Sequence, residues 1–282
     1  MAGLRQRLHR ARDVAHEARK RSMAVEAAFS TYERDREAVG NVLAGAVAFR
    51  LFVYLLPVVL VAIALLGILV SFDPNSPEDL SRSVGMSTYL VTSVGTAADQ
   101  SHKSLWVLVP LAIIAVVTAG SAAAKVVRAI SALAWRQPIT RMRHIPGAAA
   151  AAFGVAVIAV LVLAVDNRLR SESPVIAFTA AIASGFVFFV VWLGVSLLLP
   201  HGDAPWKALI PGAILVASGI QALHLVSLYY LGSRIQSSSE LYGPLGAGAA
   251  MLGFLYLVGR LLVAGAMLNA TLYDLKTRRS ET

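Results

Sequence analysis

Residues Ser239–Asp274 read SELYGPLGAGAAMLGFLYLVGRLLVAGAMLNATLYD and contain one long apolar run, Leu245–Leu272, with a single basic residue, Arg260. A helix needs roughly 20 apolar residues to cross the hydrocarbon core of a bilayer, so this run predicts a transmembrane helix. A charged side chain inside such a helix costs about 2.5–3.5 kcal/mol on insertion scales. Arg260 therefore requires a polar partner or a nearby aqueous boundary, which makes this helix a candidate for a functional site.

The whole chain has the composition of a polytopic membrane protein. Of its 282 residues, 57% are hydrophobic and 15% are charged, whereas soluble domains are about 25% charged. The apolar residues fall into blocks that suit helices and are too long and continuous for barrel strands. The expected fold class is all-α, with six transmembrane helices over Val42–Val70, Leu105–Ala124, Pro146–Val165, Val175–Leu199, Trp206–Leu231 and Leu245–Leu272.

Lysine and arginine are distributed unevenly between the two sides of the membrane. With both termini inside, 18 of the 25 lie in cytoplasmic segments and five lie outside, while Arg50 and Arg260 fall within spans. By the positive-inside rule this asymmetry predicts cytoplasmic N and C termini. The net charge of +9 is then mostly a topology signal rather than a sign of nucleic-acid binding, and no nucleic-acid partner is expected.

Three segments are expected: 1–41, a basic cytoplasmic N-terminal segment; 42–272, the six-helix transmembrane domain; and 273–282, a cytoplasmic tail. In 1–41, apolar residues recur at helical spacing and arginines occupy the other faces, which predicts an amphipathic basic helix. Such a helix can lie on anionic lipid headgroups, so membrane lipids are the expected partner. A partly ordered tail that only enforces topology is the alternative, and a homo-oligomer is left open.

The sequence offers no pattern for a metal, a cofactor or a catalytic centre. It has no cysteine, and no two of its six histidines have ligand spacing on one helix face. GxSxG, Walker and HExxH motifs are absent. We therefore expect no metal, no cofactor and no enzymatic activity, and a membrane-embedded hydrolase or ribonuclease is the least favoured hypothesis.

Two segments resemble the YihY/BrkB family of bacterial inner-membrane proteins. The first span, NVLAGAVAFRLFVYLLPVVLV, is similar to the family's small-residue, Ala-Phe-aromatic and Leu-Pro pattern. The last span is similar to its closing pattern, which runs Tyr-Gly-Ser/Pro-Leu-Gly-Ala and ends Gly-Ala-Glu-Leu-Asn. The corresponding positions in this chain are Pro57, Tyr242, Gly243, Pro244, Gly246, Gly265 and Asn269, and Gly253 is a further structural glycine between the two parts of the closing pattern.

The resemblance implies a multi-pass protein of the bacterial inner membrane, linked by name to a virulence factor, and it suggests a transporter-like role. The chain departs from the family at Arg50, where tyrosine is common, and at Met267, where glutamate is common. Loss of that carboxylate argues against a proton or cation relay at this position.

Four residues are candidates for a substrate or anion site. Arg50 and Arg260 both fall in the cytoplasmic half of the membrane, and a buried guanidinium needs acceptors for its five donors. Tyr256 lies one turn from Arg260 and is a candidate wall, and His224 is a polar group in the fifth span. The alternatives are that the arginines snorkel to the lipid headgroups and that His224 is a hydrogen-bonded structural histidine. No acidic residue falls within the expected spans, so an external anion is expected at Arg260.

The glycines of the last span are expected to bring it close to the bundle core, as small residues do in membrane helices. Gly246, Gly253 and Gly265 are the expected contact points, and Tyr242-Gly243-Pro244 marks a break that could flex.

Two main functional hypotheses follow from these features. The first is a transporter or flippase-like protein for an anionic or amphipathic, lipid-like substrate. The second is a non-transporting scaffold in envelope assembly that uses the basic cytoplasmic surface and the packing faces. A water-lined cavity that reaches both arginines favours the first hypothesis, and a solid core favours the second.

The charge asymmetry makes a testable topology prediction. Reporter fusions after Ser104, Arg170 and Gln236 should report an outside location, and fusions after Pro138 and Thr282 an inside location. A cytoplasmic signal after Ser104 would overturn this assignment.

Overall fold

The structure is a computed structural model that describes residues 23–72, 105–138, 147–170, 174–227 and 244–280. The described part is all-helical, which confirms the all-α part of the expected fold class. In chain order the helices are α2 (Met23–Glu37), α3 (Gly40–Phe72), α6 (Leu105–Ala134), α7 (Ala148–Arg170), α8 (Pro174–Leu198), the short 3₁₀ helix η1 (Trp206–Leu209), α9 (Ile210–Val226) and α11 (Pro244–Ser280).

Five stretches in the described part are long and apolar enough to cross a membrane, and they lie in α3, α6, α8, η1 with α9, and α11. Within α7, the expected third span, the apolar stretch is shorter, Ala150–Ala159. Pro244 is the first residue of α11, where its fixed φ and missing N–H suit a helix start. Pro57 is buried inside α3, whereas Tyr242, Gly243 and most of the basic N-terminal segment lie outside the described residues.

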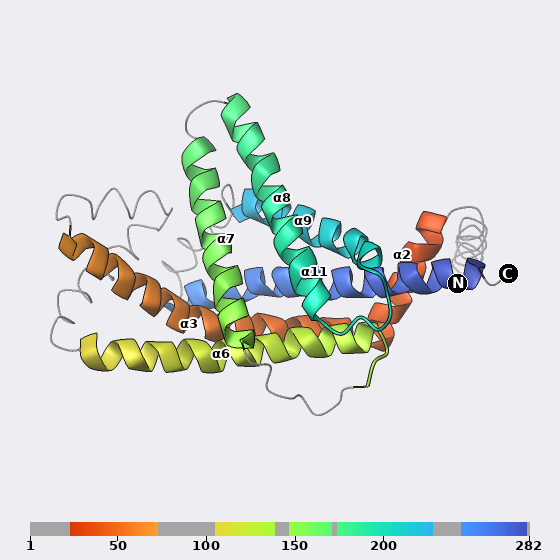
Figure 1. Cartoon of the computed structure of the whole chain (residues 1–282), viewed down its shortest axis with the longest axis horizontal. Coiled ribbons are helices and arrows are strands. Elements are labelled where there is room, and N and C mark those ends of the chain that lie inside the picture. Colours follow the sequence, from red (N-terminus) through yellow and green to blue (C-terminus); the bar gives the residue numbers. More distant parts are fainter. Residues whose placement is uncertain (1–22, 73–104, 139–146, 171–173, 228–243, 281–282) are drawn as a thin grey trace, which may run out of the picture.

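The helices form two groups that cross each other. α3, α6 and α11 run side by side along the long axis, and α7 and α8 form a hairpin that crosses them steeply (Figure 1). α7 packs on α6 and α8, α8 packs on α9, and α9 packs on α11. α2 lies across α11 and contacts it directly. α11 therefore touches α2, α3, α6 and α9 and links most of the structure.

The hydrophobic core lies where α3, α6, α9 and α11 meet. Its members are small or branched apolar residues, together with one methionine. The cluster contains Ala44, Val47, Ile130, Ala134, Val216, Leu262, Val263, Met267 and Ala270. Met267 is fully buried, so the position at which the family commonly has glutamate lies in the centre of this apolar core.

Glycines allow α11 to approach two neighbouring helices at backbone distance. A Cβ atom on Gly259 would lie 2.6 Å from the carbonyl oxygen of Ala44 in α3. A Cβ on Gly265 would lie 2.7 Å from Cγ2 of Val216 and 3.1 Å from the carbonyl oxygen of Gly212, both in α9. Gly265 thus lies at a close contact of the expected kind, and Gly259 provides a second one.

Of the other two expected contact points, Gly246 is buried but Gly253 is not at a contact. Gly253 is exposed, and a Cβ built there meets no described atom within 4 Å. The expectation of close packing at Gly253 is therefore wrong within the part of the chain that the structure describes.

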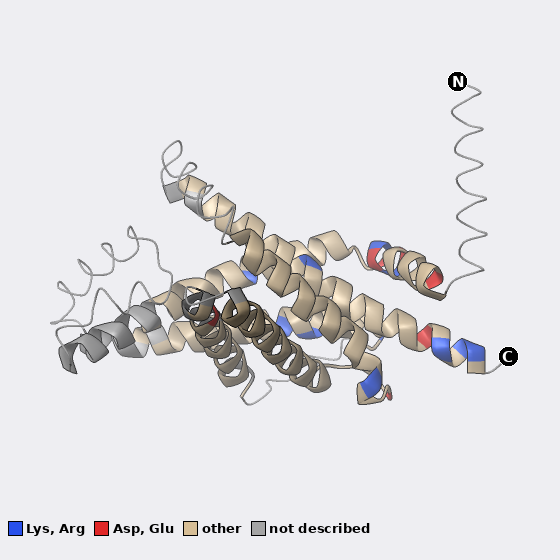
Figure 2. Cartoon of the chain, turned by 90° about the horizontal axis from the view of Figure 1, so that it is seen from above, with Lys and Arg blue, Asp and Glu red and all other residues tan. Residues whose placement is uncertain are grey.

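Charged residues gather at one end of the described structure. Figure 2 shows them on α2 and on the last turns of α11, with long uncharged stretches of helix elsewhere. This region, the charged end, comprises α2, the C-terminal corner of α6 and residues 271–280 of α11.

The packing predicts opposite outcomes for two glycines of α11. Gly259→Ala should lower the free energy of unfolding by about 1–3 kcal/mol, because the added methyl group overlaps the α3 backbone. Gly253→Ala should leave stability unchanged or raise it slightly, because alanine favours helix by about 1 kcal/mol over glycine. Unfolding in detergent, followed by circular dichroism, checks both, and equal stability of the two variants would contradict the packing.

Candidate functional site

Arg260 is paired with a carboxylate of α2. Its Nη1 donates to Oδ1 of Asp35 at 3.0 Å, and its Nη2 donates to Oδ2 at 3.1 Å. This bidentate geometry is the strongest arrangement in which a guanidinium and a carboxylate can pair. The Arg260 side chain is 31% exposed and the Asp35 side chain is 13% exposed, so the ion pair is partly buried.

Arg260 and Asp274 of α11 pair with two adjacent residues of α2, Asp35 and Arg34. Arg260 precedes Asp274 by 14 residues, or about 21 Å of helix. Arg34 precedes Asp35 directly in α2, and its Nη2 lies 2.5 Å from Oδ2 of Asp274. Long arginine side chains therefore bridge this distance. Arg260 therefore resembles a snorkelling arginine whose terminal partner is a protein carboxylate. The sequence reasoning missed this partner because Asp35 lies before the first span, 225 residues away.

The corner between α2 and α3 fixes the position of Asp35. Val39 has a φ of +53°, a left-handed conformation that is unusual for a β-branched residue, and it turns the chain sharply after α2. Gly40 follows, and a Cβ atom there would overlap the Asp35 carboxylate. A glycine is thus required at position 40 if Asp35 is to lie over the start of α3 and face Arg260.

Two further ion pairs hold α2 on α11. Arg34 donates to Asp274 and to the hydroxyl of Thr271, at 3.4 Å for the latter. Arg279 donates to Glu26 at 2.9 Å. Among the described residues of α2, only Ala27 is buried. The attachment of α2 is therefore mainly electrostatic, with little apolar burial to support it.

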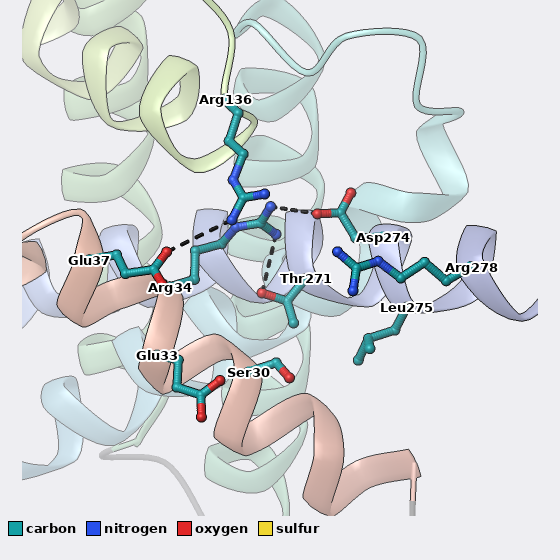
Figure 3. A pocket seen from close by; sticks show the side chains of 9 residues that line it. All are labelled: Ser30, Glu33, Arg34, Glu37, Arg136, Thr271, Asp274, Leu275 and Arg278. Atoms are coloured by element: carbon teal, nitrogen blue, oxygen red, sulfur yellow. Dashed lines mark hydrogen bonds and ion pairs between the residues drawn. The ribbon is translucent and has the colours of Figure 1, made fainter.

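An open pocket of about 180 Å³ lies between α2, the C-terminal corner of α6 and the last turns of α11 (Figure 3). Arg34, Arg136 and Arg278 contribute guanidinium groups to its lining, and Ser30 and Thr271 contribute hydroxyls. Neither Arg50 nor Arg260 lines this pocket.

The other candidate residues lie apart from Arg260. Arg50 is exposed on the surface of α3. Tyr256 is half-buried and packs against the core cluster, one turn before Arg260. His224 lies in the last turn of α9 and faces α7. The four candidates therefore do not form one constellation.

His224 belongs to a separate buried polar cluster. Its Nε2 lies 3.1 Å from Oδ2 of Asp166 in α7, and the Asp166 side chain is only 1% exposed. One turn earlier on α9, Gln221 donates to the hydroxyl of Ser184 and to the carbonyl of Ala181, both at 2.7 Å. The sequence reasoning placed Asp166 just beyond the end of its span and so missed it as the partner of His224.

Asn269 joins α11 to the start of α9. Its Oδ1 accepts a hydrogen bond from the backbone N–H of Gly212 at 2.6 Å, and its Nδ2 donates to the carbonyl of Leu209 at 3.1 Å. The first N–H groups of a helix have no partner within the helix. Asn269 therefore caps α9 from a different helix, at the same level as the Gly212–Gly265 contact.

The sequence model of the family described as Virulence factor BrkB matches residues 31–282 of the chain. Neither a curated protein nor a solved structure matches it. The matched range covers every helix from α3 to α11 and includes Arg34, Asp35, Arg260 and Asn269.

The cap predicts a specific cost for losing the Asn269 side chain. Asn269→Ala should destabilise the protein by about 1–3 kcal/mol, because a buried N–H and a buried carbonyl lose their partners. Ser218→Ala is the matched control in α9, since the Ser218 hydroxyl is exposed and bonds only to its own helix; its effect should stay within about 0.5 kcal/mol. Thermal unfolding in detergent compares the two, and an equal loss would contradict the capping role.

Proposed function

The chain belongs to the Virulence factor BrkB family, and from that premise we propose that it is a transporter or flippase-like protein for an anionic or amphipathic, lipid-like substrate. It acts in the bacterial inner membrane, and membrane lipids with anionic headgroups are its partners. The paired arginine of α11, Arg260, recognises the anionic group of the substrate.

In this proposal α7 also crosses the membrane, as the third of six spans, and the charged end faces the cytoplasm. The concentration of lysine and arginine at one end supports this orientation. α11 has 37 residues, or about 55 Å of helix, which exceeds the roughly 30 Å hydrocarbon core. Its charged last turns therefore extend beyond the membrane into water.

The bidentate pairing of Arg260 with Asp35 carries the proposal. A carboxylate on the guanidinium fork occupies the place that an anionic headgroup would take. This carboxylate comes from α2, which is attached mainly by ion pairs rather than by apolar burial. An incoming anion can therefore exchange with Asp35 without disturbing the core cluster.

Arg50 and Tyr256 have supporting roles in the same mechanism. The exposed guanidinium of Arg50 on α3 attracts anionic headgroups near the membrane surface. Tyr256 is held against the core cluster and forms an apolar wall beside Arg260 for the substrate's chain. His224 and Asp166 form a second functional position within the bundle. Ionisable groups at membrane depth usually mark such positions.

The non-transporting scaffold is the second candidate. The apolar cluster shared by α3, α6, α9 and α11 favours it, because a solid core leaves α2 and the charged end as the surfaces available for interaction. The two proposals differ in one measurable property, the movement of lipid across a membrane.

The test uses proteoliposomes that contain a fluorescent anionic phospholipid in a phosphatidylcholine background. Wild-type protein should increase the rate at which a membrane-impermeant reductant bleaches the inner-leaflet label, relative to protein-free vesicles. Arg260→Leu should slow this movement about tenfold or more, because a hydrogen bond to a charged group is worth about 1.5–3 kcal/mol and about 1.4 kcal/mol corresponds to tenfold in rate.

Gly253→Ala is the control in the same helix, since this glycine lies away from Arg260's partner and from the helix contacts. Its rate should match wild type. A wild-type rate equal to that of protein-free vesicles, for both anionic and zwitterionic labels, would contradict transport and favour the scaffold. Circular dichroism of each variant establishes that it is folded.

A further inference from the structure

The pocket at the charged end brings together guanidinium groups from three different elements. Arg34 comes from α2, Arg136 from the corner that ends α6, and Arg278 from the last turns of α11, and all three point toward the pocket (Figure 3). The hydroxyls of Ser30 and Thr271 line the same space. Guanidinium and hydroxyl donors that converge in this way suit an oxyanion, and arginine in particular suits carboxylate and phosphate.

Arg136, just beyond the end of α6, has a left-handed backbone conformation that is unfavourable for a residue other than glycine. Its φ is +50°, in the left-handed region. Its N–H bonds to the carbonyl of Leu133 at 3.1 Å, and the N–H of Gln137 bonds to the carbonyl of Ala132 at 2.8 Å. This pair of bonds is the Schellman ending of a helix, at which glycine is preferred. Strained residues of this kind concentrate at binding sites, and here the strained residue supplies a guanidinium to the pocket.

Three carboxylates also line the pocket, those of Glu33, Glu37 and Asp274, so an anion must compete with them for the guanidinium groups. Asp274 is already matched to the guanidinium of Arg34. Glu37 lies 3.8 Å from Arg136, and both side chains are more than half exposed, so this contact contributes little. A doubly charged oxyanion can replace Glu37 as the partner of Arg136 and gain Arg278 as a second partner.

We propose that this pocket is a binding site for a phosphate-type dianion, held by Arg34, Arg136 and Arg278. A phosphomonoester lipid headgroup and a soluble phosphate ester both present this chemistry. The site is separate from Arg260, which does not line the pocket. Equilibrium binding here is therefore independent of whether the protein moves lipid.

The experiment titrates inorganic phosphate into full-length protein in detergent, at constant ionic strength, by calorimetry. Wild-type protein should bind phosphate saturably. Arg136→Gly should raise the Kd for phosphate about tenfold or more, equivalent to about 1.4 kcal/mol. Its melting temperature should be no lower than that of wild type, because glycine suits the left-handed position. Arg278→Gln should weaken binding in the same direction and keeps the test independent of the Arg136 backbone.

Lys125→Gln is the control for charge alone. Lys125 is exposed on α6 and does not line the pocket, so its loss should leave the Kd unchanged. Three results would overturn the site: no saturable phosphate binding by wild type, unchanged binding by both arginine variants, or equal weakening by Lys125→Gln and Arg136→Gly.

A second arm identifies the source of the phosphate group. The titration is repeated in nanodiscs of phosphatidylcholine, with and without phosphatidic acid. If phosphatidic acid raises the apparent Kd for inorganic phosphate in wild type but not in Arg136→Gly, the lipid headgroup occupies the site. If it has no effect while saturable binding persists, the ligand is a soluble phosphate ester, and glycerol 3-phosphate should then compete with inorganic phosphate.

Discussion

The bundle depends on the close approach of α11 to α3 and α9. In lipid the hydrophobic effect does not draw helices together, so packing contacts and hydrogen bonds must hold them. Gly259 places α11 against the backbone of Ala44, and Gly265 places it against Gly212. Asn269 adds two buried hydrogen bonds at the second contact. Since Arg260 follows Gly259 directly, the same approach that builds the core also sets the position of Arg260.

The same helix is held differently by α2. These contacts are ion pairs to Glu26, Arg34 and Asp35. Ion pairs near water weaken with salt and with competing ions, whereas packing in the core does not. α11 therefore makes two kinds of contact along the same stretch of helix. One kind is close packing at Gly259, Gly265 and Asn269. The other is the set of ion pairs that Arg260, Asp274 and Arg279 make with α2.

The sequence alone predicted where the helices lie, but it did not predict which polar residues pair between them. Apolar run length placed the helices, since each must close its own backbone hydrogen bonds. The partners of Arg260 and His224 come from other helices, 225 and 58 residues away, and no local pattern encodes such pairings. Gly253 shows a related limit: glycine content marks a helix that can pack closely, but the neighbours decide which glycines make contact.

The proposed exchange of anions at Arg260 draws on the distribution of charge through the bundle. The core position at which the family commonly has glutamate holds Met267, which is fully buried among apolar neighbours. An acid there would be an internal counter-ion, fixed to the same helix as Arg260. The chain instead supplies the carboxylate from α2, across a corner strained at Val39 and closed by Gly40. A counter-ion on an element with little buried apolar surface can leave when another anion arrives, whereas one built into the core cannot.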